Sequence, residues 1–331
     1  MKKRILTGDR PTGKLHLGHY VGTLKNRVAL QNEYDCFFII ADLHMLTTKY
    51  QDLKTVKQNI NDLVLDYLSV GIDPQKSNIF VQSLIPQIPS LFTLFTMLTT
   101  VPRLQRVPTL KDVMRDLKIE TASLGLLSYP VLQAADILIV RANLVPVGKD
   151  QASHIEVTRE IAQRFNSLYG EVFPLPEVLI GEVPTLPGID GKAKMSKSLE
   201  NAIYLSDDSE SVLEKVMRMY TDPTRLRPTD PGHVEGNPVF IYHEAFNKDK
   251  EEVADLEKRY REGRVGDVEV KEKLAKALNG FLEPIRAKRK EYEGRPELIE
   301  KIILEGSERI QAEGKETLDL VKKAMGLKYF D

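Results

Sequence analysis

The 331-residue sequence contains one cysteine, which is too few for an internal disulfide or for a metal site built from cysteine thiolates. This residue, Cys36, begins an apolar run over residues 36–40, so we expect a buried structural thiol rather than a nucleophile. No apolar run approaches the roughly 20 residues that a helix needs to cross a bilayer, which excludes a membrane-spanning protein. The charged residues 2–4 are not followed by the apolar segment of a signal peptide, and we therefore expect a cytoplasmic protein.

The sequence also lacks an excess of charge of either sign. Lysine and arginine total 47 and aspartate and glutamate total 48, which gives a formal net charge of −1. A protein that coats nucleic acid without specificity usually has a strong basic excess, so the balance argues against that class. A local basic cluster is present at Arg286, Lys288, Arg289 and Lys290, which either contacts phosphates or is only a solvated surface.

From residue 4 to about residue 205, short apolar segments alternate with longer amphipathic ones. The amphipathic residues 55–70 place their apolar side chains on one face of a predicted helix. Several of the short segments are apolar throughout, as expected of parallel strands that are covered on both faces. We predict strands at residues 5–7, 36–41, 78–82, 138–140 and 145–147. The alternation predicts an α/β fold with a doubly wound, parallel, Rossmann-type sheet.

The regular alternation is interrupted at about residues 86–120, which we interpret as an insertion between the two halves of the sheet. Its apolar helix suits either a dimer interface or ordinary core packing. After the capping residues 206–208 the composition changes, and residues 249–325 have helical spacing without a convincing strand. We therefore predict a catalytic domain at residues 1–205 and an all-helical domain at residues 206–331.

A first candidate phosphate-binding segment lies near the N-terminus. Gly8, Gly13 and Lys14 have the spacing of a phosphate-binding P-loop, but Leu15 stands where that loop needs a serine or threonine hydroxyl for Mg²⁺. A P-loop nucleotide hydrolase is therefore kept only as an alternative.

The next residues, His16-Leu17-Gly18-His19, precede a helical pattern. Two histidines three residues apart can face one ligand, and Gly18 lets a flat group approach the backbone. A helix N-terminus also favours an anion such as phosphate. The alternative is a pair of incidental surface histidines.

A second basic motif, Lys194-Met195-Ser196-Lys197-Ser198, lies in a Pro- and Gly-punctuated loop over residues 187–200. Two ammonium groups on a mobile loop can close over a polyphosphate and neutralise charge on a leaving group. The alternative is a solvated basic loop.

Taken together, the histidine and lysine motifs resemble the paired nucleotide-binding motifs of class I aminoacyl-tRNA synthetases. Residues 9–13 and 129–138 resemble the tryptophan and tyrosine branch, and residues 145–151 resemble the tryptophan members of that branch. Arg10 and Gln133 depart from the usual tryptophan pattern, and glutamine at position 133 is common in tyrosine members. Tyrosine therefore remains an alternative substrate.

The resemblance implies a role for each matching residue. The residues implied to bind ATP are Arg10, Pro11, Thr12, Gly18, His19, Gly148, Lys149, Asp150, Leu186, Lys194, Met195, Ser196, Lys197 and Ser198. His16, His19, Lys194 and Lys197 are implied to act catalytically on the triphosphate. Asp136 is the implied acceptor for the indole N–H of tryptophan. The other residues implied to form the amino-acid pocket are Tyr129, His44, Gln133 and Gln151.

The same resemblance implies substrates and partners. They are ATP, with Mg²⁺ carried by its phosphates rather than by a protein metal site, L-tryptophan and the tryptophan tRNA. The amino acid would be activated as an adenylate and then transferred to the tRNA, whose anticodon would meet the helical domain of a homodimer. A catalytically silent relative is the remaining alternative, and the intact histidine and lysine motifs argue against it.

Overall fold

The computed structural model describes residues 2–51, 53–147, 152–180, 186–227 and 229–329. Five parallel strands form one sheet in the order β3-β2-β1-β4-β5. Their bounds are β1 (Arg4–Asp9), β2 (Asp35–Ile40), β3 (Ser77–Val81), β4 (Leu144–Val147) and β5 (Glu177–Ile180). Because β1 lies between β2 and β4, the chain changes sides at β1. The crevice at the carboxyl ends of β1 and β4 is where such sheets bind ligands.

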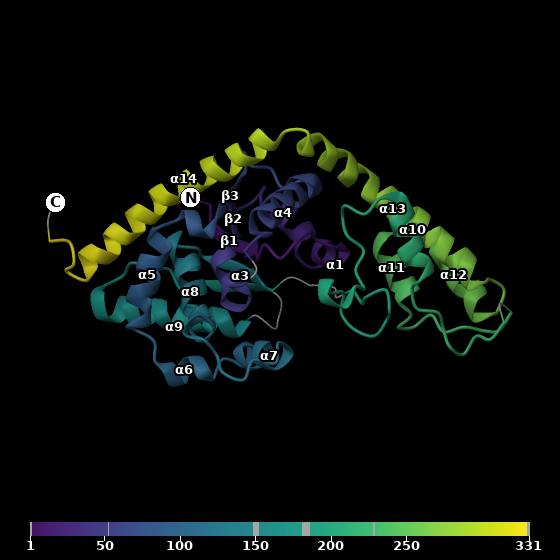
Figure 1. The fold of residues 1–331 in the computed structure, drawn as a ribbon, viewed down its shortest axis with the longest axis horizontal. Coiled ribbons are helices and arrows are strands. Elements are labelled where there is room, and N and C mark those ends of the chain that lie inside the picture. Colours follow the sequence, from purple (N-terminus) through teal and green to yellow (C-terminus); the bar gives the residue numbers. More distant parts are fainter. Residues whose placement is uncertain (1, 52, 148–151, 181–185, 228, 330–331) are drawn as a thin grey trace.

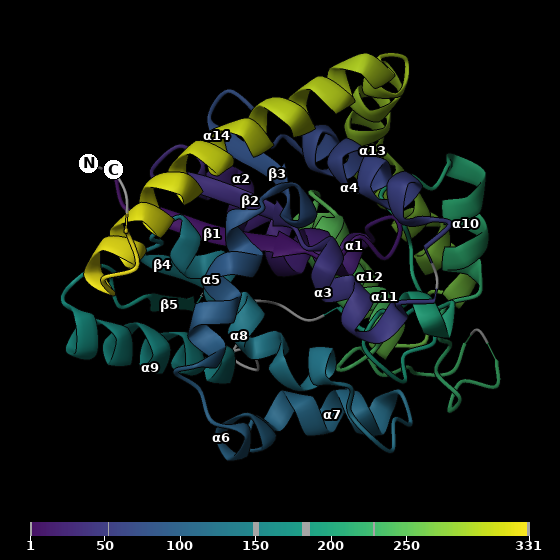
Figure 2. The same ribbon diagram turned by 60° about the vertical axis from the view of Figure 1, so that its left-hand side comes forward.

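Helices connect and flank these strands (Figures 1 and 2). In the first half of the chain they are α1 (Leu17–His19), η1 (Tyr20–Leu24), α2 (Lys25–Leu30), α3 (Asp42–Lys49), α4 (Val56–Val70), η2 (Gln82–Leu84), α5 (Gln87–Thr96), α6 (Val101–Gln105), α7 (Pro108–Asp116) and α8 (Leu124–Ile139). In the second half they are α9 (Ala152–Tyr169), η4 (Lys197–Leu199), α10 (Ser209–Met217), α11 (Pro238–Phe246), α12 (Lys250–Arg261), α13 (Asp267–Glu293) and α14 (Pro296–Ala324).

Two hydrophobic cores cover the two faces of the sheet. Phe38 of β2 points into one core with residues of α4 and of the helices α10 to α13. Its neighbours Phe37 and Ile39 point into the other core with residues of α5, α8 and α9. Successive side chains of a strand alternate between faces, so a strand covered on both sides is apolar throughout. The α/β fold predicted from the sequence is therefore confirmed.

The last helix, α14, runs from the helical region back across the sheet, along the top of Figure 1. Ile302 near its start belongs to the first core and Ile310 belongs to the second, so the helix passes over the edge strand β3. At Gly306 a Cβ atom would lie 1.9 Å from the carbonyl oxygen of Ile79, so the two backbones are in direct contact. The predicted domain boundary between residues 205 and 206 remains a prediction. Helix α14 packs against residues from both of the predicted domains.

One predicted strand is wrong. Residues 138–140 lie at the end of α8 and immediately after it. Leu138 and Ile139 are fully buried, so this part of the helix has no polar face, and a short apolar run cannot distinguish a buried helix from a buried strand. The short edge strand β5 was not predicted. It has four residues, and Glu177 is exposed.

The apolar helix of the predicted insertion is α5. Leu91 and Phe95 are fully buried in the second core, so core packing accounts for them. Met97 and Val101, at the turn between α5 and α6, are 70% and 53% exposed. Among the described helices, none has an apolar stretch long enough to cross a bilayer.

Candidate active site

A cavity of about 420 Å³ opens at the carboxyl ends of β1 and β4. Residues of β1 and the loop after it form one wall, and α8 forms another. The rest of the lining comes from β2, β4, η1, α2, α3 and α7. Its lining includes Leu6, Gly8, Asp9, Arg10, His44, Thr109, Tyr129, Gln133, Asp136, Ile137, Val145 and Pro146. The cavity thus brings together the described residues that the sequence assigned to amino-acid binding. Gln151 lies outside the described residues.

Asp136 is the buried acidic group of this cavity and is only 2% exposed. The side-chain amide of Gln82 donates to both carboxylate oxygens, at 2.8 and 2.9 Å, and Nε2 of His44 lies 2.8 Å from Oδ2. Burial raises the pKa of Asp136, while the hydrogen bonds from His44 and Gln82 oppose that rise. A carboxylate has about four acceptor sites, so these bonds leave capacity for one more donor.

Gln82 was not predicted from the sequence. It is fully buried directly after β3, at the same edge of the sheet as the cavity. Its place at the carboxyl end of a predicted strand was the available signal.

The cavity is partly covered by the inserted helix α7. Oη of Tyr129 lies 2.7 Å from Oγ1 of Thr109, and the Tyr129 ring stands edge-on to His44 with centroids 6.5 Å apart. Gln133 lines the cavity one helical turn from Asp136 and is half-buried. The insertion therefore contributes side chains to the site.

The histidine motif begins a continuous helical stretch formed by α1, η1 and α2. The His16 and His19 rings are 3.8 Å apart, and the backbone N–H of His16 donates to Nδ1 of His19 at 3.2 Å. Nδ1 of His16 is buried and has no partner among the described residues. Burial, together with nearby Lys197 and Lys194, lowers the pKa of His16 to about 3 and that of His19 to about 4, although Asp9 opposes the shift of His19. Both imidazoles are therefore neutral at neutral pH.

The lysine motif begins at the end of a hairpin over residues 187–194, called here the lysine hairpin, which folds onto the histidine motif. Met195 donates its N–H to the carbonyl of Leu186 at 3.3 Å, and its buried sulfur lies 3.4 Å from the Gly18 nitrogen. Nζ of Lys197 donates to the Gly13 carbonyl at 2.7 Å. Burial lowers the pKa of Lys197 to about 8, although Asp9 and Asp66 oppose this shift. Lys194 is exposed.

Asp9 ends β1 between the cavity and the histidine motif. Arg27 pairs with its carboxylate at 2.5 Å, and the Tyr67 hydroxyl donates to it at 2.7 Å. Burial alone would raise the pKa of Asp9, but Arg27, with smaller contributions from His19 and the Tyr67 hydroxyl, outweighs it and lowers the pKa to about 2. Asp9 therefore remains ionised and fixes β1 to α2 and α4.

The remaining predicted ATP residues occupy several environments. Arg10 lines the cavity, Pro11 is buried, Thr12 is half-buried, and Leu186 is buried at the base of the hairpin. The N–H of Ser196 donates to Oδ1 of Asn201 at 2.8 Å, and this hydrogen bond fixes its backbone. Gly148, Lys149 and Asp150 lie outside the described residues, as does the side chain of Ser198.

The P-loop alternative is wrong. In a P-loop the backbone N–H groups of residues 13–15 would face a phosphate. Here the Leu15 N–H donates to the buried carboxylate of Asp66 at 2.7 Å. In the described part of the chain, no group of His, Cys, Asp and Glu side chains is placed to hold a metal ion.

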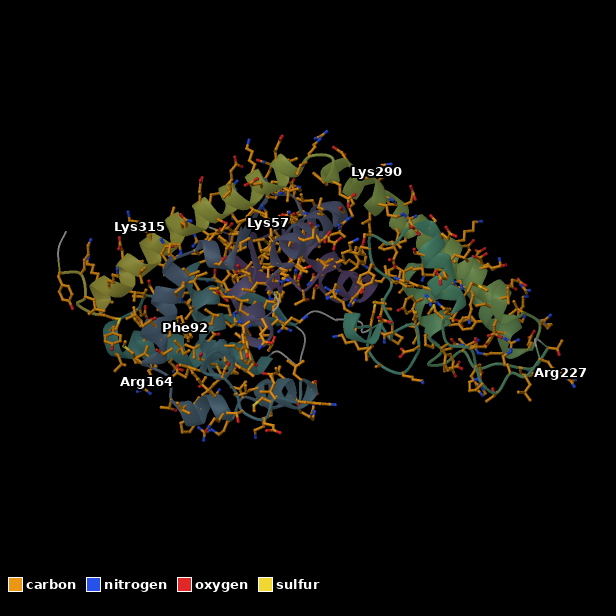
Figure 3. The ribbon with its side chains drawn as sticks, viewed as in Figure 1. Lys57, Phe92, Arg164, Arg227, Lys290 and Lys315 are labelled. Carbon is orange, nitrogen blue, oxygen red and sulfur yellow. The ribbon has the colours of Figure 1, made fainter. Side chains whose placement is uncertain are left out.

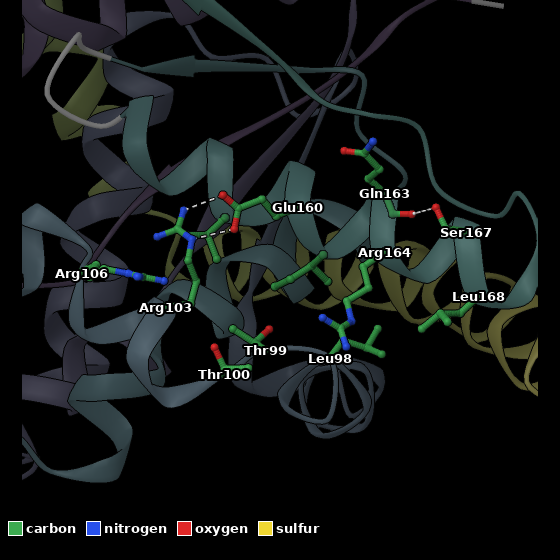
Figure 4. A pocket seen from close by; sticks show the side chains of 12 residues that line it. Leu98, Thr99, Thr100, Arg103, Arg106, Glu160, Gln163, Arg164, Ser167 and Leu168 are labelled. Carbon is green, nitrogen blue, oxygen red and sulfur yellow. Dashed lines mark hydrogen bonds and ion pairs between the residues drawn. The ribbon is translucent and has the colours of Figure 1, made fainter.

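A second cavity, of about 640 Å³, lies between α9 and the turn joining α5 to α6 (Figure 4). Arg103 forms a bidentate ion pair with Glu160, at 2.7 and 2.8 Å. Arg106 and Arg164 also line the cavity. The residues predicted from the sequence are not among those that line it. Since the carboxyl ends of β1 and β4 open into the first cavity, the first one is the candidate active site.

Known proteins resemble this chain over almost its whole length. Residues 1–283 match the family model of tRNA synthetases class I (W and Y). The tryptophan–tRNA ligase of Treponema pallidum is 57% identical over 98% of this chain and 97% of its own length, and that of Chlamydia caviae is 54% identical over 98% and 96%. Among solved structures, tryptophanyl-tRNA synthetase from Campylobacter jejuni, complexed with ADP and tryptophan, superposes with a TM-score of 0.88 at 35% identity, over 98% of this chain and all of that chain.

We expect the His16→Asn variant to lose less folding stability than the parent when the pH falls. The folded state binds a proton on His16 only near pH 3, whereas the unfolded chain binds it near 6.5, so stability is lost as the pH falls through this window. Asparagine does not titrate and removes this contribution, while His19 retains one of the same sign. The measurement is the melting temperature of parent and variant from neutral pH downwards. Parallel curves would show that the imidazole of His16 is not held neutral by burial.

Proposed function

This chain belongs to the family of class I tRNA synthetases for tryptophan and tyrosine, and we propose that it activates L-tryptophan with ATP and transfers it to tRNA. The high identity to tryptophan–tRNA ligases over almost the whole chain carries the choice of tryptophan over tyrosine. The prediction of a class I aminoacyl-tRNA ligase, which was made from the two nucleotide-binding motifs, is thus confirmed. The assignments of individual residues that follow are part of the proposal.

Asp136 accepts the indole N–H of tryptophan in this proposal. Its remaining acceptor capacity and its burial support that role, because a hydrogen bond in a dry site strongly disfavours substrates that lack the donor. Gln82 and His44 hold the carboxylate in place, and Tyr129 and Gln133 border the same cavity. The apolar wall includes Leu6, Ile137 and Val145, which suits an aromatic side chain.

In the first reaction step, a carboxylate oxygen of tryptophan attacks the α-phosphorus of ATP, and the bond to the bridging oxygen breaks. Pyrophosphate leaves with Mg²⁺ that its phosphates carry. The neutral imidazoles of His16 and His19 would donate N–H groups to the phosphates without losing a proton. Lys197 and Lys194 would neutralise the charge that moves onto pyrophosphate. Arg10, Thr12, Gly18 and the Ser196 region would position the nucleotide.

In the second step, a ribose hydroxyl at the end of the tRNA attacks the carbonyl carbon of the adenylate, and AMP leaves. The helical region from residue 206 onwards is proposed to bind the anticodon, with Lys288 and Lys290 available to phosphates. Both lysines are exposed, and Lys290 points outward near the bend between α13 and α14 (Figure 3). Arg289 is buried and Arg286 is bonded within the protein, so they are not part of that surface.

The proposal includes a cytoplasmic homodimer. The exposed apolar residues Met97 and Val101 lie together at the turn between α5 and α6, where a second copy would cover them.

We expect tryptophan alone among the twenty amino acids to support rapid exchange of pyrophosphate into ATP. The experiment measures exchange with each amino acid at equal concentration. Faster exchange with tyrosine would overturn the choice of substrate. No exchange with any amino acid would identify the chain as a catalytically silent relative.

We expect Asp136→Ala to reduce kcat/KM for tryptophan by at least about 10²-fold, because the variant loses the acceptor and leaves the indole N–H unpaired in a dry cavity. Phenylalanine has no such donor and should be affected far less, so the ratio of the two kcat/KM values is the measurement. The melting temperature of the variant controls for damage to the fold. An unchanged ratio would mean that Asp136 only supports His44 and Gln82.

Replacing either lysine of the motif by alanine should slow adenylate formation by roughly 10²-fold, since one preorganised charge contact is lost in the transition state. Tryptophan binding without ATP should not change. The sequence contains no tryptophan, so the fluorescence of bound tryptophan reports the ligand alone. Lys192→Ala is the matched control, because this lysine is exposed on the same hairpin. Equal rates for the parent, Lys194→Ala and Lys197→Ala would remove both lysines from the mechanism.

A further inference from the structure

A buried carboxylate lies behind the histidine motif. Asp66 of α4 has no exposed surface, and its Oδ2 accepts the backbone N–H of Leu15 at 2.7 Å. Its other oxygen pairs with Arg289 of α13, which also pairs with Asp62 at 2.5 Å and with Glu293 at 2.8 Å. Leu15 immediately precedes His16, so one side chain joins the ATP-binding segment to the helical region.

The buried pair of Asp66 and Arg289 is not explained by a contribution to folding stability alone. A charged pair loses its hydration on burial, and apolar side chains of similar size often stabilise a core equally well. Burial raises the pKa of Asp66 to about 6, while Arg289 and the Leu15 N–H oppose the rise. The Arg289 guanidinium is thus one of the groups that favour the ionised form of a carboxyl which has no exposed surface.

Residues 13–15, which Asp66 holds at Leu15, are also hydrogen-bonded to residues 197 and 205. The Leu15 carbonyl accepts the N–H of Leu205 at 3.0 Å, and the Gly13 carbonyl accepts Lys197 at 2.7 Å. Asp66 fixes the opposite side of the same peptide chain through the Leu15 N–H. This carboxylate is therefore one of the groups that fix the backbone immediately before His16.

The helical region contacts the nucleotide motifs at two further points. The ring of Phe281 on α13 stands edge-on to Tyr20, which follows His19, with centroids 4.8 Å apart. The hydroxyl of Tyr242 on α11 donates to the Pro187 carbonyl, at the base of the lysine hairpin, at 2.7 Å. Helix α13 therefore acts on both sides of the histidine motif. Arg289 pairs with Asp66, which binds Leu15, and Phe281 packs against Tyr20.

We propose that Asp66 and Arg289 are positioning residues for ATP: Arg289 fixes Asp66, and Asp66 holds the Leu15 N–H so that His16 faces the nucleotide. The inference rests on the proposed function for the identity of the nucleotide. It makes the ATP affinity of the catalytic region depend on an arginine of the helical region.

The test compares Asp66→Asn with the parent. An amide cannot accept from both the Leu15 N–H and Arg289, because one of its two ends is a donor. We expect the dissociation constant of ATP, measured by calorimetry without amino acid, to rise about tenfold, as for the loss of one hydrogen bond to a charged group. The affinity for tryptophan, measured by its fluorescence, should stay the same. Arg289→Gln should weaken ATP binding similarly, and Arg289→Lys should lie between Arg289→Gln and the parent.

Two control variants separate positioning from stability. Asp267→Asn disrupts the partly buried pair with Arg225 in the helical region, where Asp267 also accepts the Tyr260 hydroxyl. It should lower the melting temperature and leave ATP binding unchanged. Asp62→Asn removes a partner of Arg289 that is not bonded to Leu15, and it should affect ATP less than Asp66→Asn does.

The inference is overturned if Asp66→Asn lowers the melting temperature as Asp267→Asn does but binds ATP like the parent. It is also overturned if ATP and tryptophan affinities fall together in Asp66→Asn. Because ATP binding is measured without amino acid, this outcome is independent of which amino acid the parent activates. A parent that binds ATP but exchanges pyrophosphate with no amino acid would refute the proposed function alone.

Discussion

Two backbone hydrogen bonds join the segments that carry the nucleotide motifs. Leu17 donates to the Ile203 carbonyl at 2.9 Å, and Leu205 donates to the Leu15 carbonyl at 3.0 Å, so residues 203–205 run antiparallel to residues 15–17. Ile203 and Leu205 are themselves fully buried in the first core. The hydrophobic core thus determines where the lysine hairpin lies relative to His16 and Gly18. The contact of Met195 with Gly18, and that of Lys197 with Gly13, follow from this pairing.

Burial sets the protonation state of the site. It keeps the two imidazoles neutral and favours the uncharged form of Lys197, while Arg27 keeps Asp9 ionised against the same effect. In such a dry environment each remaining charge and each aligned N–H interacts more strongly than in water. A polyanion that entered between the histidines and Lys197 would meet donors that are already oriented, so little reorganisation would be needed.

The sequence predicted the features that depend on local pattern. Strands covered on both faces are largely apolar, which identified β1 to β4, and the motif residues were identifiable from their order alone. The end of α8 was misread because Leu138 and Ile139 lie in its last turn, where the side chains are buried. Gln82 and Asp66 were missed for a different reason. Their partners, Asp136 and Arg289, lie far away in the chain, and no local pattern records a pairing at that distance.

The path of α14 has a consequence for how the chain folds as it is synthesised. Strand β3 is at the edge of the sheet, and α14 lies against its backbone at Gly306. The Val81 N–H donates a hydrogen bond to Oγ of Ser307 at 3.4 Å. Until the ribosome has released residues 296–324, this edge keeps unpaired backbone groups and both cores lack part of their apolar cover. A nascent chain in that state can pair with another strand, so the interval before α14 docks is when aggregation competes with folding.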